Sequence, residues 1–107
     1  MTTERRPYWR PIAWQDIEGH AVYVGQGDPS AGQRFIDCVE ETVENLCVHP
    51  ELGAIYESAE LRLGDIRATL VSDFKRHAVF YRVEDRMIDV VRVLGRGQNM
   101  DMLLRNE

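Results

Sequence analysis

The sequence predicts an α+β domain in which an N-terminal strand and an antiparallel helical hairpin pack on a small antiparallel β-sheet. In the first half of the chain, apolar residues recur at spacings of three and four, which indicates helices. From residue 66 onward they alternate in period two, which indicates strands. The expected element order is β-α-α-β-β-β with a short C-terminal tail. The 107 residues fit a single domain, with its core between about residues 8 and 104.

The first predicted elements are a strand and a helix. Residues 8–14 are rich in aromatic residues and roughly alternate, which predicts a strand. Pro11 is expected at an edge of the sheet, because proline cannot donate a ladder hydrogen bond. One stripe of an amphipathic helix then follows, ending at residues 25–27 and formed by Trp14, Ile17, Ala21 and Val24.

The second helix carries clear start and stop signals. Asp28 followed by Pro29 is typical of a helix N-terminus, and Pro50 disfavours helix at the preceding residue. The helix should therefore end near Val48. Its apolar stripe consists of Phe35, Ile36, Val39, Val43, Leu46 and Cys47. Because only about four residues link the two helices, we expect them to lie antiparallel.

Three strands are predicted after the hairpin, over residues 66–71, 78–83 and 87–94. The short links between them imply an antiparallel meander. The segment 95–99 breaks the last strand, and residues 100–104 form a short amphipathic tail.

Composition limits the class of protein. With 44% hydrophobic and 29% charged residues the chain should fold. No apolar run reaches the roughly 18 residues of a membrane span. The first residues contain no apolar stretch typical of a signal peptide, so we expect a cytoplasmic protein without a membrane partner. Cys38 and Cys47 lie nine residues apart, on opposite faces of the second helix, so they cannot form a disulfide with each other.

Charge is unevenly distributed along the chain. Residues 13–57 contain nine acidic residues and one basic residue, whereas residues 58–107 contain eight acidic and nine basic residues. The net charge of −5 argues against broad nucleic-acid binding, and no direct sequence-specific binding is expected. Lys75 is the only lysine, and the remaining cations are arginines, which favour bidentate recognition of carboxylates or phosphates.

No catalytic, metal or cofactor motif stands out. The serines that could act as nucleophiles lie in no recognisable motif, and they are Ser30, Ser58 and Ser72. The histidines are too scattered for metal-ligand spacing, and they are His20, His49 and His77. His20 falls on the apolar stripe of the first helix and is expected to be structural. We therefore expect no catalytic residue, metal or cofactor.

The arginines of the predicted sheet are the most informative set: Arg62, Arg67, Arg76, Arg82, Arg92 and Arg96. Arg67 alternates with Ile66 and is expected on the face that the helices do not cover. Arg92 shares its parity with Val90 and is expected to be partly buried and paired, with Asp89 or with a carboxylate across the sheet. Each arginine alone suits a surface charge or a structural ion pair. Their convergence near a glycine-rich strand end favours a binding role.

Several motifs together resemble one known family. The tandem strands HAVFYRV (residues 77–83) and IDVVRVL (residues 88–94) are the most specific of them. The others are Asp16-Ile17, Tyr23-Val24, Pro29-Ser30-Ala31, Phe35, Pro50 with Gly53, and Ile66-Arg67. From about Trp9 to Leu104 the chain is similar to the ParE branch of the RelE/ParE toxin superfamily, whose fold agrees with the pattern above. The chain departs from this family at Gly95, where a histidine is frequent, and at residues 97–99, which look like a small insertion. Its helical hairpin is also more acidic.

The resemblance implies the toxin of a type II toxin–antitoxin pair, which inhibits DNA gyrase by binding and is neutralised by a ParD-like antitoxin. One alternative is a ribosome-dependent mRNA endonuclease like the RelE relatives, and another is a degenerate, non-toxic homologue. With one lysine and no tyrosine after Tyr81, the proton-transfer residues of the nuclease are missing, which favours the non-enzymatic toxin.

Candidate residues follow from this reading. For target binding we expect Arg92, Arg96 and the tail at residues 97–104, including Met100 and Asp101, with Arg67 and Arg76 as weaker candidates. For the antitoxin we expect an apolar groove that accepts an amphipathic segment. Its expected lining residues are Phe74, Ile17 and Val24.

Overall fold

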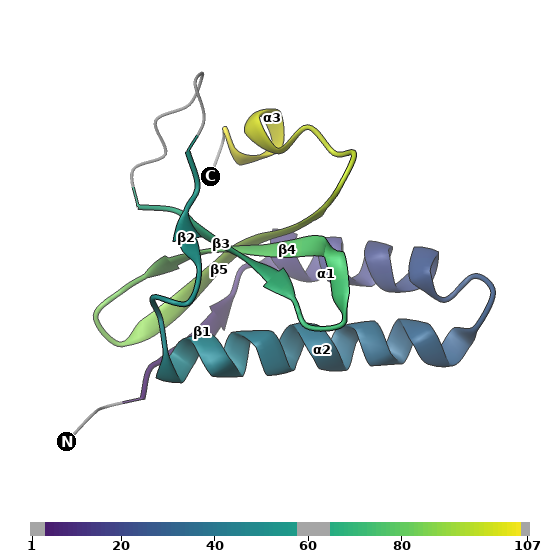
Figure 1. Ribbon diagram of the computed structural model, residues 1–107, viewed down its shortest axis with the longest axis horizontal. Coiled ribbons are helices and arrows are strands. Elements are labelled where there is room, and N and C mark those ends of the chain that lie inside the picture. Colours follow the sequence, from purple (N-terminus) through teal and green to yellow (C-terminus); the bar gives the residue numbers. More distant parts are fainter. Residues whose placement is uncertain (1–3, 58–64, 106–107) are drawn as a thin grey trace.

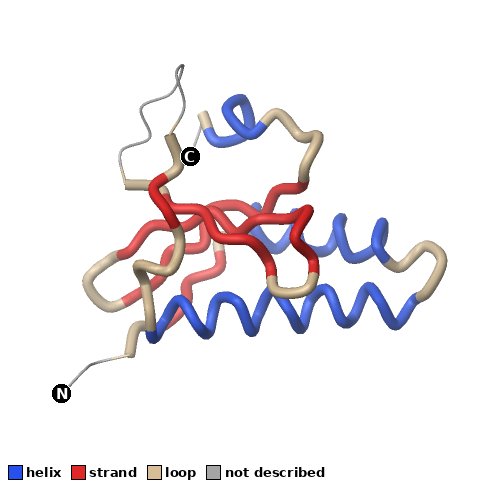
Figure 2. Tube along the Cα trace, in the orientation of Figure 1, coloured by secondary structure: helices blue, strands red, loops and turns tan. Residues whose placement is uncertain are grey.

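The computed structural model describes residues 4–57 and 65–105. A five-stranded mixed sheet carries a helical hairpin on one face and a short C-terminal helix on the other (Figures 1 and 2). The elements are β1 (Arg6–Trp9), α1 (Pro11–Val24), α2 (Pro29–Val48), β2 (Ala54–Ile55), β3 (Arg67–Val71), β4 (Phe74–Val83), β5 (Met87–Gly95) and α3 (Met100–Leu104). The predicted α+β class is confirmed, as are the helical hairpin and the three-strand meander.

The boundary between β1 and α1 differs from the prediction. The strand expected over residues 8–14 ends at Trp9, and Pro11 begins α1 instead of lying at a sheet edge. A proline suits the first helical turn because its fixed φ is helical and its missing N–H would have no partner there. The carbonyl oxygen of Arg10 accepts the first helical hydrogen bonds, from Ala13 and Trp14.

The sheet is mixed, with strand order β1-β5-β4-β3-β2. β1 pairs with β5 in parallel, with Tyr8 opposite Asp89, while the other pairs are antiparallel. The sequence pattern predicted neither this parallel pair nor the two-residue strand β2. A parallel partner far away in the chain leaves no local signal, because the connection runs through the whole helical hairpin.

Apolar side chains form two cores, one on each face of the sheet. The larger core lies between the sheet and the helical hairpin and includes Ile17, Phe35 and Tyr81. The smaller core lies on the opposite face and joins the sheet to α3, with members Ile66, Ala78, Phe80, Val91, Leu94 and Leu104. Burying one such large side chain contributes about 1.5–3 kcal/mol, so the second core helps to fix α3.

The sheet-face prediction for Arg67 is wrong. Arg67 lies opposite Tyr81, which is in the hairpin-side core, so Arg67 is on the hairpin face. The second core explains the error: it buries Ile66, so alternation alone could not identify the helix-covered face. The parity that Arg92 shares with Val90 in the sequence does not place the two on one face, because a bulge opposite Phe80 and Tyr81 leaves Val91 as the extra residue of β5.

Tyr81 anchors the loop that follows α2. Its hydroxyl donates to the carbonyl oxygen of Pro50 (2.8 Å) and accepts from the N–H of Gly53 (2.9 Å). The contact excludes any larger residue at position 53, because a Cβ there would lie 2.6 Å from the Tyr81 hydroxyl. Burial raises the pKa of Tyr81, so the phenol stays protonated and able to donate.

We predict that Tyr81→Phe lowers the free energy of unfolding by about 1–3 kcal/mol, because the Gly53 N–H and the Pro50 carbonyl lose their partner. Urea denaturation measures the change. Tyr8→Phe is the matched control, because the Tyr8 side chain is 49% exposed. The control substitution should cost less than about 0.5 kcal/mol, as is usual at the surface. Equal destabilisation by the two variants would contradict the assignment.

Candidate functional site

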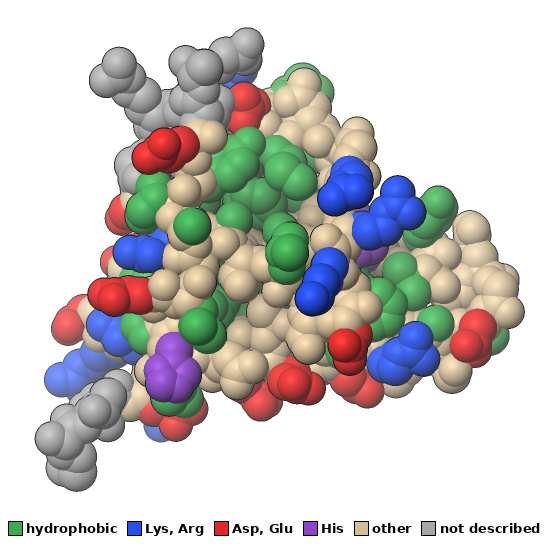
Figure 3. Space-filling model, in the orientation of Figure 1, with side chains coloured by type: hydrophobic (Ala, Val, Ile, Leu, Met, Phe, Trp, Pro, Cys, Tyr) green, Lys and Arg blue, Asp and Glu red, His purple; other side chains and the backbone are tan. Residues whose placement is uncertain are grey.

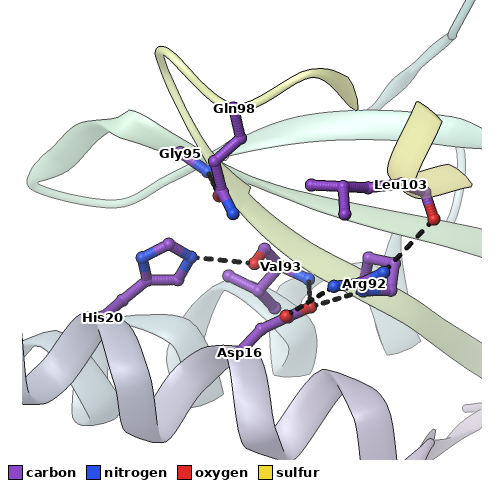
Figure 4. A network of polar contacts seen from close by, with 7 residues as sticks. All are labelled: Asp16, His20, Arg92, Val93, Gly95, Gln98 and Leu103. Carbon is purple, nitrogen blue, oxygen red and sulfur yellow. Dashed lines mark hydrogen bonds and ion pairs between the residues drawn. The ribbon is translucent and has the colours of Figure 1, made fainter. Parts of the chain in front are cut away.

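The candidate site lies at the C-terminal end of β5, where α1 replaces a missing strand (Figure 4). β1 pairs with residues 87–90, so among residues 4–57 and 65–105 no strand pairs with the outer edge of β5 beyond Val90. The Asp16 carboxylate accepts from the Val93 N–H (3.1 Å), and His20 Nε2 donates to the Val93 carbonyl oxygen (3.0 Å). An exposed strand edge carries unpaired backbone N–H and carbonyl groups and is prone to pair with other chains. Here Asp16 and His20, one helical turn apart on α1, form hydrogen bonds with the backbone groups of Val93.

Arg92 joins three elements at this edge. Its Nε and Nη2 donate to the two carboxylate oxygens of Asp16 (2.7 and 2.8 Å), and its Nη1 donates to the Leu103 carbonyl oxygen at the end of α3 (3.2 Å). Such bidentate, charge-assisted pairs are geometrically specific. Arg92 is only 8% exposed, so its guanidinium links α1, β5 and α3 from inside the protein.

Asp89, an expected partner of Arg92, is paired with a different arginine. Arg10, between β1 and α1, donates from Nε and Nη2 to the two carboxylate oxygens of Asp89 (2.9 and 2.8 Å). The prediction that Arg92 is buried and paired is therefore confirmed, while its partner is Asp16. The nearby pair of Arg82 with Asp65 is more open, since the Asp65 side chain is 73% exposed.

A basic hollow lies beside this network. Arg76 and Arg96 are both exposed, and the Arg96 N–H donates to the Arg76 carbonyl oxygen (2.7 Å), which holds the two backbones together. The hollow has a volume of about 240 Å³ and is lined by His20, Tyr23, Arg76, His77, Gly95, Arg96 and Gln98, without an acidic residue. Figure 3 shows basic side chains on the right-hand part of the visible face, and others along its left edge.

Two histidines form the inner wall of the hollow. The rings of His20 and His77 lie 4.6 Å apart between centroids, and the His77 ring lies 4.8 Å from that of Phe35. Burial, His20 and Arg76 lower the pKa of His77 to about 4, so this ring is neutral at pH 7. Gly95 leaves room for it, because a Cβ at position 95 would lie 3.2 Å from the His77 ring.

The tail after β5 is held by side-chain hydrogen bonds. Gln98 accepts from the Gly95 N–H (2.6 Å), and Asn99 caps α3 by accepting from the Met102 N–H (3.1 Å). Asp101 accepts from the Tyr56 hydroxyl (2.6 Å), a bond that raises the pKa of Tyr56 to about 12. The tail therefore has a defined position on the sheet.

The structure brings together only some of the residues expected to bind a target. Arg76 and Arg96 line the hollow, whereas Arg92 is buried and paired with Asp16. Asp101 accepts from the hydroxyl of Tyr56, the residue that follows β2, and neither it nor Met100 is among the described residues that line the hollow. Arg67 lies apart from Arg76 and Arg96, because its Nη1 donates to the Gly53 carbonyl oxygen (2.7 Å) near the other end of β3. Arg62 and Ser58 lie outside the described residues.

The residues expected to bind an antitoxin are less accessible than predicted. Ile17 is fully buried in the hairpin-side core, so it does not line a surface groove. Val24 and Phe74 are half-buried against the same core. Sequence reasoning did not name Asp16 as a site residue, although Asp16-Ile17 is one of the motifs of the family resemblance and Asp16 lies one helical turn before His20.

We predict that Arg92→Met lowers the free energy of unfolding by about 3–5 kcal/mol, because it leaves the Asp16 carboxylate buried and unpaired. Urea denaturation is again the measurement. Arg82→Met is the control, since its partner Asp65 is exposed. Loss of such an exposed pair should cost about 1 kcal/mol or less. A cost for Arg92→Met no larger than that of the control would contradict the structural role.

A second prediction concerns pH. His77 has a folded-state pKa of about 4, below the ordinary 6.5, so the unfolded chain binds more protons between these values. The His77 contribution to stability should therefore be complete above about pH 6.5 and decline as the pH falls toward 4. We expect the unfolding free energy of His77→Phe to fall less than that of the parent between pH 7 and 5, while the exposed control His49→Gln follows the parent. Parallel pH profiles for parent and His77→Phe would refute this.

The described part of the chain shows neither a metal-binding cluster nor a helix that could span a membrane. Within residues 4–57 and 65–105, no group of three or more histidine, cysteine or acidic side chains is arranged to hold a metal ion. In the same part of the chain, none of the helices combines the length and the apolarity that crossing a membrane requires.

Comparisons with known proteins identify the family. Residues 8–100 match the sequence profile described as "ParE toxin of type II toxin-antitoxin system, parDE". No curated protein sequence matches the chain. A solved structure titled "Chromosomal ParDE TA system from P. aeruginosa" has a similar fold, with a TM-score of 0.70 and 18% identity over 89% of this chain and 99% of that one. Because the profile spans most of the chain, this protein belongs to the ParE toxin family of type II toxin–antitoxin systems.

Proposed function

We propose that this toxin inhibits DNA gyrase by direct binding, without catalysing a reaction, and that a ParD-like antitoxin neutralises it. The observation that carries the proposal is the end of the sheet where exposed Arg76 and Arg96 stand beside the ordered tail. The Asp16–Arg92 ion pair holds that tail in place through the Leu103 carbonyl. A preorganised surface of this kind favours tight association because little freedom is lost on binding.

The chemistry of this surface supports binding rather than catalysis. A general base works best with a pKa near the operating pH and within reach of its substrate. His77 has a pKa of about 4, and His20 uses its Nε2 to hold the Val93 carbonyl. The remaining cations at the hollow are arginines, which do not exchange protons at neutral pH.

The antitoxin is expected to cover an apolar patch next to the hollow. Val22 and Tyr23 are 70% and 71% exposed at the end of α1, and half-buried Val24 and Phe74 pack on the same core. An amphipathic segment that lays its apolar face on such a patch is a common mode of recognition. Because Tyr23 also lines the hollow, a bound segment would cover the arginines and so block their access to a target.

We predict that the purified toxin inhibits DNA supercoiling by gyrase and stabilises a cleavage complex, and that Arg76→Ala with Arg96→Ala weakens both effects at least about tenfold, the expected loss for one or more charge-assisted contacts. Arg86→Ala is the matched control. It removes one of the two charges that the double variant loses, but from an exposed position in the turn between β4 and β5, at their other end, and should keep full inhibition.

Three results would contradict this proposal. One is an absence of inhibition and of cleavage complex at a large molar excess of toxin. Another is translation-coupled cleavage of mRNA by the unmutated protein, which would indicate the ribosome as the target. The third is normal growth when the toxin is expressed without an antitoxin, which would indicate a non-toxic homologue.

A further inference from the structure

We infer that the hollow between Arg76 and Arg96 is a binding site for a phosphate group. The site is independent of the gyrase proposal, since it requires only this chain. Arg76 lies near the start of β4, and Arg96 lies in the turn after β5. The Arg96 N–H donates to the Arg76 carbonyl oxygen (2.7 Å), which joins the two backbones. This bond holds two cations at the mouth of one hollow.

Two like charges held together without a counter-ion indicate a site for an anion. None of the described residues that line the hollow is acidic, although the chain has 18 acidic residues and a net charge of −5. Within the described residues, neither Arg76 nor Arg96 forms a salt bridge, whereas Arg10, Arg82 and Arg92 each pair with an aspartate. The planar guanidinium matches the oxygens of a phosphate in a bidentate manner.

Residues other than the two arginines also line the hollow and add a hydrogen-bond donor. Gln98 Oε1 is occupied by the Gly95 N–H, so its amide NH₂ group is left to donate to a ligand. Tyr23 and the neutral His77 ring also line the hollow. The two arginines supply permanent positive charge, and the Gln98 amide donor favours an oxygen-rich anion.

The size of the hollow limits the ligand. Its volume is about 240 Å³. Pockets that enclose a whole small molecule are larger, at roughly 300 Å³ or more. The hollow suits one phosphate group, which can belong to a free anion, such as inorganic phosphate or one end of pyrophosphate, or project from the backbone of a nucleic acid. Both sources present the same oxygens to the arginines, so an experiment must separate them.

The test measures binding by the whole chain to pyrophosphate, by calorimetry, and to a short fluorescent duplex DNA, by anisotropy. We expect at least one of the two probes to bind, and we expect Arg76→Ala or Arg96→Ala to weaken that binding about tenfold. Substitution of the same arginine by lysine should restore only part of the binding, because lysine keeps the positive charge but cannot donate two parallel hydrogen bonds to a phosphate. Binding of the duplex alone assigns the backbone as the source, and binding of pyrophosphate assigns a free anion.

Arg86→Ala again separates the site from the overall charge, and it should change affinity less than twofold. Equal loss in Arg86→Ala and Arg76→Ala would overturn the inference, as would failure of both probes to bind the parent protein. Thermal unfolding of each variant checks that these exposed substitutions leave the fold intact. The outcome is separable from the gyrase proposal: phosphate binding without gyrase inhibition would refute only the latter.

Discussion

The ion pair between Asp16 and Arg92 is the interaction on which the C-terminal half of the structure depends. Its two residues lie 76 positions apart in sequence, yet both are largely buried and joined by two hydrogen bonds. Through this pair α1 closes the open edge of β5, and the same guanidinium holds the end of α3. A buried ion pair adds less net stability than its Coulomb attraction suggests, because both charges lose water. Its main effect here is to fix one arrangement of helix, strand and tail.

The distribution of charge follows from this arrangement. The acidic residues concentrate in the helical hairpin and its flanking loops, whereas Arg76 and Arg96 are exposed where β4 begins and β5 ends. The total charge of −5 therefore gives little information about the partner of the basic hollow. The apolar end of α1 borders the same hollow through Tyr23, so one surface combines the proposed target site with the proposed antitoxin site. That overlap provides a steric route to neutralisation.

Local patterns predicted the helices and the antiparallel strands because periodicity and end signals, such as Asp28–Pro29, act over a few residues. Local patterns failed where a contact between distant parts of the chain determines the face of the sheet on which a residue lies. The side of the sheet that Arg67 occupies depends on the second core, and the side that Arg92 occupies depends on a bulge opposite Phe80. In the sequence, Asp16 is indistinguishable from a solvent-facing acidic residue of an amphipathic helix. Its role depends on the edge of β5, which lies beside it only in the folded protein. The arginines of the site were found from their positions in the predicted strands, and the burial of Arg92 was predicted as well, whereas its partner Asp16 and the hollow at Arg76 and Arg96 required the structure.

Amide hydrogen exchange in Asp16→Ala tests most directly whether this ion pair fixes the end of β5 and the tail. The Val93 amide donates to Asp16, while the Glu84 amide donates to Met87 at the other end of β5. We predict that exchange at Val93 accelerates at least tenfold relative to Glu84, and that exchange at Leu103 in α3 also accelerates. Glu18→Ala, an exposed change on the same helix, should leave these ratios as they are in the parent. Unchanged ratios in Asp16→Ala would contradict the account.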